Sequence, residues 1–205
     1  MSDMPDFGPL EERLGHEFRD RSLLLQALTH RSYLNENTGY EYPHNERLEF
    51  LGDAVLELIV TEFLYKNYAN DEGELTNWRA ALVNAKTLAG ISHDLNFEEY
   101  LLLSKGEAKD KDSKARMYIL ANAIEAIIGA VYLDGGMPAS EKFIGRHVLS
   151  HLPKILKDEL YVDAKSKFQE TAQELMGVTP TYKVLEEKGP DHAKEFTIGV
   201  FLDKE

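Results

Sequence analysis

The chain has 205 residues, of which 43% are hydrophobic and 29% charged, and it contains no cysteine. This length suits one full domain and a smaller one; the apolar fraction excludes wholesale disorder, and the lack of cysteine excludes disulfides and thiolate metal sites. Lysine and arginine total 23 against 36 acidic residues, and this net charge of −13 disfavours a general electrostatic nucleic-acid binder unless the carboxylates hold a divalent cation.

The first residues, 1–9, carry acids and no apolar run, which predicts that there is no secretory signal. We also expect no stretch with the roughly 20 apolar residues of a membrane span. The sequence therefore predicts a soluble, cytoplasmic protein with no membrane partner.

Most of the chain, from Ser22 to about Leu156, has the apolar periodicity of helices. Residues 104–116 are polar and rich in lysine, which predicts a mobile loop between helices. Gly135 and Gly136 predict a helix end. The expected long helices cover 44–65, 75–95, 118–133 and 140–155.

The pattern changes after about residue 161. A helix expected over 165–175 is followed by two stretches with strand character, 181–185 and 195–201, joined by a turn at 189–191. One helix and two strands predict an α+β module that is small for an independent folding unit. The expected division is a helical domain over 1–156, a linker over 157–163 and a truncated second module over 164–205.

Three acidic residues, Glu46, Glu49 and Asp53, lie at i, i+3 and i+7 within the helix expected over 44–65. This spacing puts the carboxylates along one line of the helix, beside its apolar stripe, although like charges in a line repel. Acids near a helix start can instead stabilise the helix dipole. That interpretation explains Glu46 well, Glu49 in part and Asp53 poorly, because Asp53 lies two turns inside.

Glu125 is the only charged residue in the strongly apolar stretch 119–132. A lone carboxylate among isoleucines and alanines loses its hydration unless it has a partner or a cation. It could pair with an arginine, such as Arg47 or Arg79. It could instead face the acidic line of the earlier helix together with Asn122, which would gather oxygen ligands suited to Mg²⁺. The spacing alone does not separate these interpretations.

Three separated segments carry a specific pattern: residues 46–56 (ERLEFLGDAVL), residues 27–33 (ALTHRSY) and residues 119–134. They resemble, in that order, the signature of the bacterial ribonuclease III family, the motif that precedes it and the family's second acidic helix. Residues 163–196 resemble the first part of a double-stranded-RNA-binding domain. The likeness implies an all-α ribonuclease III-type catalytic domain followed by an incomplete α+β double-stranded-RNA-binding module.

The resemblance also implies an activity: Mg²⁺-dependent endonucleolytic hydrolysis of double-stranded RNA, in which Mn²⁺ can substitute. The products would carry 5′-phosphate and 3′-hydroxyl ends, in rRNA and mRNA processing. Two subunits of a homodimer would each contribute an acidic cluster to a valley that holds the duplex. The implied roles are metal binding for Glu49, Asn122 and Glu125, catalysis for Asp53 and Glu125, a place in the cleft for Glu46, and a dimer contact for Phe50.

Outside this cluster, the resemblance assigns RNA minor-groove contacts to residues of the second module. A solvated helix face and a plain turn are the ordinary interpretation of the same positions. Phe50 would likewise be an ordinary core residue without the resemblance. The RNA-contacting residues would be Gln169, Glu170, Gln173 and His192.

Asn122 departs from the family pattern, which has aspartate at this position. An amide oxygen can ligate Mg²⁺ but is neutral, so weaker metal binding is expected. The alternative function is therefore a double-stranded-RNA-binding dimer with weakened or lost catalysis. A purely structural role is a further alternative, against which the retained Glu49, Asp53 and Glu125 argue.

Overall fold

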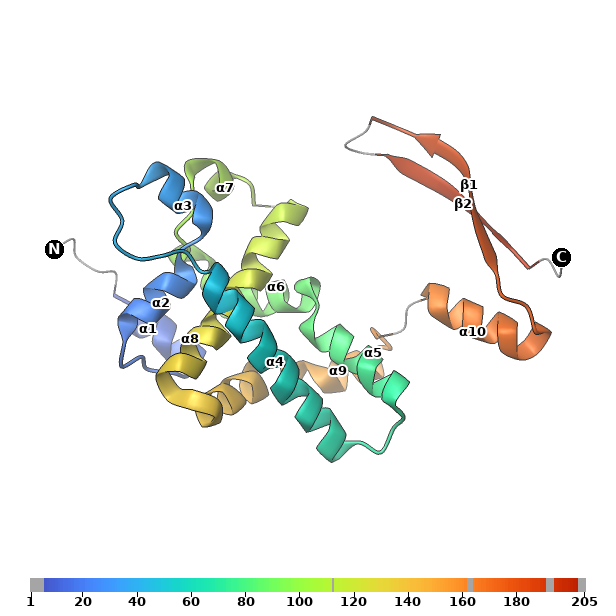
Figure 1. Cartoon of the computed structure of the whole chain (residues 1–205), viewed down its shortest axis with the longest axis horizontal. Helices are drawn as coiled ribbons and strands as arrows, with labels where there is room; N and C mark the ends of the chain where they lie inside the picture. Colours follow the sequence, from blue (N-terminus) through green and yellow to red (C-terminus); the bar gives the residue numbers. More distant parts are fainter. Residues whose placement is uncertain (1–5, 112, 162–163, 191–193, 203–205) are drawn as a thin grey trace. The chain divides into compact units, whose positions relative to one another are not determined.

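The computed structural model describes residues 6–111, 113–161, 164–190 and 194–202, and the chain divides into two compact units between Tyr161 and Val162. The first unit is helical, whereas the second has one helix and two strands (Figure 1). Both parts of the predicted fold class are therefore confirmed. The boundary falls inside the linker predicted over 157–163.

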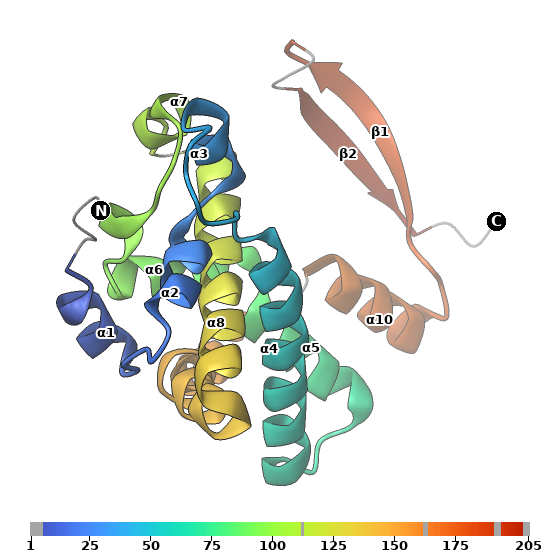
Figure 2. The ribbon, with the colours of Figure 1, turned by 60° about the vertical axis from the view of Figure 1, so that its left-hand side comes forward.

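Two long helices, α4 and α8, form the centre of the first unit. They lie side by side in Figures 1 and 2 and pack against each other, while α2 and α6 also pack on α8. Because neighbours cover it on several sides, α8 is apolar around most of its circumference. The helices of this unit are α1 (Gly8–Leu14), α2 (Arg21–Leu28), α3 (Arg31–Glu36), α4 (Glu46–Asn67), α5 (Glu72–Val83), α6 (Ala85–Asp94), α7 (Lys105–Lys109), α8 (Lys114–His147) and α9 (Leu152–Lys157), with 3-10 turns at Glu98–Tyr100 and Leu149–His151.

The apolar character of α8 corrects one expectation from the sequence. Within the described residues, the helical stretch Lys114–Lys157 is long and apolar enough to cross a membrane by length and composition alone. However, 61% of its apolar window is buried inside the unit, as in the core helix of a folded domain. Burial against α2, α4 and α6 accounts for its composition.

The prediction of one long helix over 75–95 is wrong, because this stretch contains parts of two helices, α5 and α6, which meet at Asn84. This residue has an extended backbone, with φ −70° and ψ 157°. Its side-chain oxygen accepts a hydrogen bond from the Thr87 amide at 2.9 Å, and its side-chain nitrogen donates to Ala81 O, also at 2.9 Å. Asn84 therefore ends α5 and caps α6, as asparagine favours at helix starts.

The mobile loop predicted over 104–116 is also wrong, because the described part of this stretch contains helical structure. Ser104 caps α7, and Ser113 caps α8. The capping hydroxyls accept hydrogen bonds from the Glu107 and Arg116 amides at 3.3 and 3.1 Å. The helix end predicted at Gly135–Gly136 is a kink, where Gly136 has φ 71° and the helix resumes beyond it.

The second unit consists of α10 (Ala164–Met176) and the antiparallel strands β1 (Thr181–Lys188) and β2 (Glu195–Phe201), which confirms the predicted elements. Thr181 pairs with Phe201, and a bulge interrupts the register between Val184 and Glu186. Val178 is buried against this small unit, whereas Val184 and Ile198 are 58% and 54% exposed.

Candidate metal centre

The start of α4 is fixed by a buried asparagine, Asn45, whose role the sequence pattern does not predict. Asn45, only 3% exposed, donates its backbone N–H to Thr29 O at 2.9 Å and its side-chain amide to Ala27 O at 3.2 Å. These bonds hold the first turn of α4 against the end of α2. The first-turn acids Glu46 and Glu49 therefore project from a defined position.

A pair of glycines lets α4 and α8 approach at backbone distance. A Cβ atom built on Gly52 would lie 1.7 Å from the carbonyl oxygen of Glu125, and one built on Gly129 would lie 2.3 Å from that of Leu48. Any side chain at either position would collide with the opposite backbone. This close approach brings the acidic line of α4 against the acidic face of α8.

Four oxygen-bearing side chains gather beside the paired glycines. Glu49 and Asp53 lie on α4, and Asn122 and Glu125 lie on α8. Asp53 is exposed, whereas the other three are partly buried. Glu49 and Asp53 both act electrostatically on Glu125, and the Asn122 amide forms a hydrogen bond that acts on Glu49. The structure thus brings together the four side chains that the resemblance grouped.

Burial and mutual repulsion raise the pKa of two carboxyl groups in this cluster. Burial, followed by the charges of Asp53, Glu49 and Glu57, raises the pKa of Glu125 to about 7. Burial and the charges of Glu46 and Asp53 also raise the pKa of Glu49, against the hydrogen bond from Asn122. When these carboxyls are ionised, the surrounding protein therefore does not fully offset their negative charge.

The arginine pairing considered for Glu125 does not form. Arg79 contacts Glu57 instead, with Nε 3.0 Å from Oε2, and donates to the Thr61 hydroxyl at 3.0 Å. Within the described part of the chain, Glu125 has no ion pair and no side-chain hydrogen bond to Arg47 or any other residue. Without a cationic side chain beside it, the Glu125 carboxyl is neutralised either by a proton, as its raised pKa indicates, or by a bound cation.

The donor set fits Mg²⁺ better than a metal that needs a closed protein cage. In the described ranges, no group of three or more His, Cys, Asp or Glu side chains is arranged to hold a metal ion. Two facing carboxylates, Glu49 and Glu125, and the amide oxygen of Asn122 are the protein ligands on offer. Mg²⁺ usually keeps several waters and binds one or two carboxylates together with substrate phosphate oxygens, which matches this open set.

The remaining predicted site residues lie in different surroundings. Glu46 is at the rim of the cluster, with its side chain 44% exposed. Phe50 is 80% exposed on the outer side of α4, so its interpretation as a core residue is wrong. In the second unit, Glu170 and Gln173 are exposed on α10 and Gln169 is partly buried, while His192 lies outside the described residues.

Two family models match the chain. The model described as ribonuclease-III-like matches residues 20–152, and the model of the double-stranded RNA binding motif matches residues 164–205. The first match contains all four members of the cluster. The second coincides with the unit that holds α10, β1 and β2.

Curated relatives and solved structures agree with these models. Ribonuclease 3 of Nitratiruptor sp. is 40% identical over 98% of this chain and 87% of the relative, and that of Campylobacter jejuni is 42% identical over the same shares. A solved nuclease domain of ribonuclease III from C. jejuni is similar with a TM-score of 0.64 and 42% identity, covering 72% of this chain and 99% of that domain.

Proposed function

The chain belongs to the ribonuclease III family, and we propose that it is a Mg²⁺-dependent endonuclease that hydrolyses double-stranded RNA. The observation that carries the proposal is the pair of partly buried carboxylates, Glu49 and Glu125, set side by side with no cationic partner among the described residues. Burial first, and then the repulsion of neighbouring carboxylates, raises the pKa of both groups, and the charge of a divalent cation would offset both effects.

In this reaction Glu49 and Glu125 would hold Mg²⁺, with the Asn122 amide oxygen as a neutral third ligand. When bound, the metal would polarise the scissile phosphate and lower the pKa of the attacking water. Asp53, whose carboxylate is exposed beside the pair, accepts the proton of that water or orients it. The water oxygen bonds to phosphorus as the bond from phosphorus to the 3′ oxygen breaks, and the 3′ oxygen takes up a proton from solvent. The products therefore carry a 5′-phosphate and a 3′-hydroxyl.

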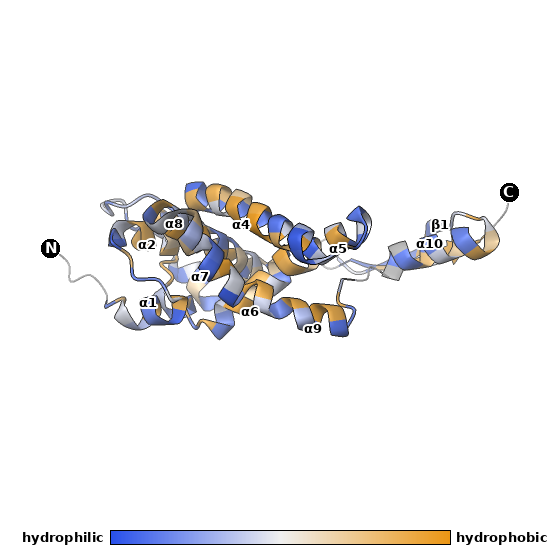
Figure 3. Ribbon diagram, turned by 90° about the horizontal axis from the view of Figure 1, so that it is seen from below, coloured by the Kyte–Doolittle hydropathy of each residue, from blue (hydrophilic) through white to orange (hydrophobic). Residues whose placement is uncertain are grey.

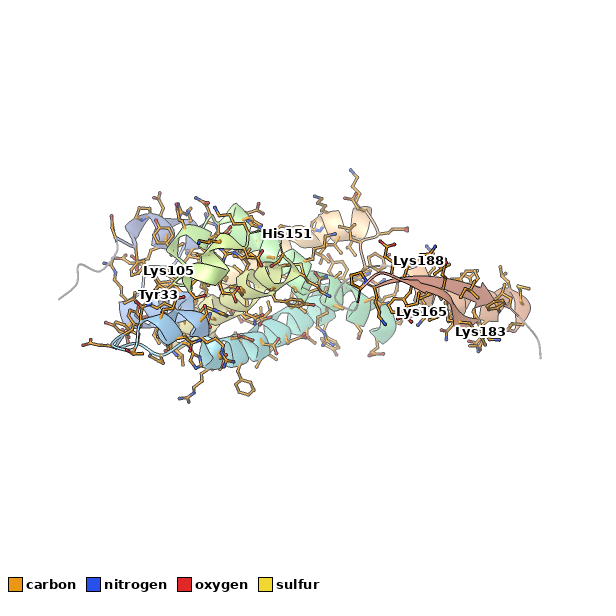
Figure 4. The ribbon with its side chains drawn as sticks, turned by 90° about the horizontal axis from the view of Figure 1, so that it is seen from above. Tyr33, Lys105, His151, Lys165, Lys183 and Lys188 are labelled. Carbon is orange, nitrogen blue, oxygen red and sulfur yellow. The ribbon has the colours of Figure 1, made fainter. Side chains whose placement is uncertain are left out.

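The proposed substrate is double-stranded RNA, and the second unit is proposed to help bind it. The match to the double-stranded RNA binding motif supports this assignment. Lys165 and Lys183, labelled in Figure 4, provide cations on α10 and β1, and Lys165 Nζ lies 4.8 Å from the centre of the Tyr182 ring. Gln169, Glu170 and Gln173 would read 2′-hydroxyls in the minor groove. We further propose a cytoplasmic role in rRNA and mRNA processing.

The proposed active form is a homodimer that uses the outer face of α4. Phe50, Leu58 and Tyr65 are 80%, 55% and 78% exposed, and Figure 3 shows apolar residues among the hydrophilic ones along this helix. A pocket of about 810 Å³ lies at the other end of the same face, lined by Thr61, Tyr65 and the start of α5. A twofold axis between two antiparallel α4 helices would place each Phe50 at the partner's pocket, about 22 Å along the helix. The related C. jejuni structure is described as having a region involved in dimer formation.

Phe50→Ala is expected to weaken this dimer by several kcal/mol, because it removes a large apolar contact at two symmetric places, each worth about 3–5 kcal/mol in a packed core. Sedimentation velocity across a micromolar dilution series measures the effect. Leu133→Ala, which truncates a side chain that is 54% exposed on α8, serves as the control. Equal dissociation constants for the two variants would contradict the proposed interface.

The proposed activity is tested with one RNA sequence supplied as a duplex and as a single strand. We expect cleavage of the duplex in Mg²⁺, none in excess chelator, and 5′-phosphate ends on the products. Cleavage that persists in chelator, or that favours the single strand, would reject the proposal.

The alternative, a double-stranded-RNA-binding dimer with weakened catalysis, rests on Asn122. Asn122→Asp adds one negative charge to the cluster, and after desolvation and repulsion about tenfold tighter metal binding is expected. The half-saturating Mg²⁺ concentration for cleavage should fall accordingly. A parent chain that binds duplex RNA without cutting it, and that gains activity through Asn122→Asp, would favour the alternative.

A further inference from the structure

Glu46 differs from the other acids of the α4 line because it has a cationic partner. Its Oε1 lies 3.2 Å from Arg31 Nη1, whereas its Oε2 lies 3.7 Å from His44 Nδ1, beyond hydrogen-bond distance. It still contributes to the raised pKa of Glu49, so it borders the cluster. Because the Arg31 guanidinium already offsets part of its charge, Glu46 is a poorer metal ligand than Glu49 and Glu125.

Arg31 is held on a well-anchored segment. Its neighbour His30 caps α3, with Nδ1 accepting the Ser32 N–H at 3.3 Å. Ser32 Oγ in turn accepts the Ser104 N–H at 3.0 Å, which ties α3 to the start of α7. Figure 4 labels Tyr33 and Lys105 on these two neighbouring helices.

The segments that carry Arg31 and Glu46 are also joined directly by a backbone hydrogen bond. The backbone N–H of Asn45, next to Glu46, donates to the carbonyl of Thr29, two residues before Arg31, at 2.9 Å. The ion pair therefore joins side chains whose backbones are already fixed. Glu46 does not need to order a flexible loop, and its carboxylate is available to orient the guanidinium.

The Arg31 side chain is 69% exposed while it contacts Glu46. A guanidinium has five N–H donors in a planar fork, and a single carboxylate contact leaves donors free for a second anion. Arginine often binds a phosphate group with two parallel N–H···O hydrogen bonds. In a cluster that is otherwise acidic, a cation at the rim offsets the repulsion felt by an approaching phosphodiester.

Resting on the proposed function, we propose that Arg31 binds a phosphodiester group of the RNA strand next to the candidate metal centre, and that Glu46 is the positioning residue that aims it. Glu46 then acts on the substrate through Arg31 and contributes no bond to the metal.

Steady-state cleavage of duplex RNA at several salt concentrations tests this assignment. Arg31→Gln, which removes the charge and leaves a shorter polar side chain, is expected to raise KM about tenfold. It should also reduce the salt dependence of KM by the amount that about one phosphate contact contributes. The half-saturating Mg²⁺ concentration should stay unchanged. Arg13→Gln is the matched control, because Arg13, which lies on α1, forms an ion pair of similar length with Glu99, at 3.3 Å.

Glu46→Gln separates positioning from metal binding. It is expected to raise KM about threefold, to leave the Mg²⁺ requirement unchanged, and to add nothing in the Arg31→Gln background, as for two residues acting as one unit. A several-fold shift in the Mg²⁺ requirement would make Glu46 a metal ligand and overturn the inference. So would a KM for Arg31→Gln equal to that of Arg13→Gln.

Duplex binding followed by anisotropy with Ca²⁺ in place of Mg²⁺ repeats the comparison without needing cleavage. If the parent chain binds but does not cut, the proposed function fails while Arg31 is still tested. If the parent cuts and Arg31→Gln binds as tightly as the control, only this inference fails.

Discussion

Glu125→Gln is expected to abolish cleavage of duplex RNA, with kcat at least about 10³-fold lower, because the metal's charge stabilisation of the transition state amounts to several kcal/mol. The substitution keeps the shape of the side chain and removes only its charge. We expect duplex binding and the dimer to persist, since Glu125 belongs to neither the second unit nor the exposed face of α4.

The same variant carries a stability signature. The folded-state pKa of Glu125, about 7, lies above the ordinary value of 4.5, so the folded protein keeps a proton that the unfolded chain has lost. In the metal-free parent, the free energy of unfolding contributed by this group therefore falls as pH rises from about 4.5 to 7. Glu125→Gln removes this slope, so above pH 7 the inactive variant should be more stable than the parent.

Glu62→Gln provides the control on α4, because Glu62 is exposed and pairs with Lys66 at 2.7 Å, away from the cluster. Its activity should equal that of the parent. The parent and both variants are compared by single-turnover cleavage and by denaturant unfolding in chelator. If the activity of Glu125→Gln stayed within tenfold of the parent's, Glu125 would not be a ligand of the metal centre.

Gly52→Ala is expected to cost at least about 2–3 kcal/mol of the free energy of unfolding, because inserted atoms in a packed core force backbone shifts. The new Cβ would lie 1.7 Å from the Glu125 carbonyl oxygen, so α4 and α8 must separate. That movement also parts Glu49 from Glu125. Cleavage should therefore fall more than the loss of folded protein explains.

Gly90→Ala is the matched control for this prediction. Gly90 lies inside α6, and nothing lies within 4 Å of a Cβ built there. Alanine is favoured over glycine in a helix by about 1 kcal/mol, so this variant should be as stable as the parent or more so. Urea unfolding of the two variants makes the comparison, and equal stability of Gly52→Ala and Gly90→Ala would show that the helices do not meet at the glycines.

The sequence predicted the helices that carry the cluster because their signal is local. Leu48, Val55 and Ile59 repeat at helical spacing, and all are buried in α4. Phe50 lies off this stripe, so its exposure could also have been expected from periodicity. Glu125 stood out as a lone charge in an apolar helix, which is where the unpartnered acid is found.

Other features depend on contacts between distant segments, which periodicity does not encode. Glycine has no side chain to register in an apolar pattern, although an isolated glycine inside a helix often has a packing reason, as Gly52 and Gly129 do. Asn84 has a dual role at two helix ends that a continuous helical pattern hides. The pairing of Arg31 with Glu46 joins α3 to α4 and needed the tertiary structure.

The central claim is that Glu49 and Glu125, from α4 and α8, hold a divalent metal ion. Titration calorimetry with Mn²⁺ in the absence of RNA tests it most directly, at pH 6 and pH 8. Because Glu125 must lose its proton to bind, with a pKa of about 7, the parent should bind more tightly at pH 8 and release a proton at pH 6. Glu125→Gln should bind at least about tenfold more weakly at pH 8, with little change between the two pH values. Binding by Glu125→Gln that equals the parent at both pH values would contradict the account.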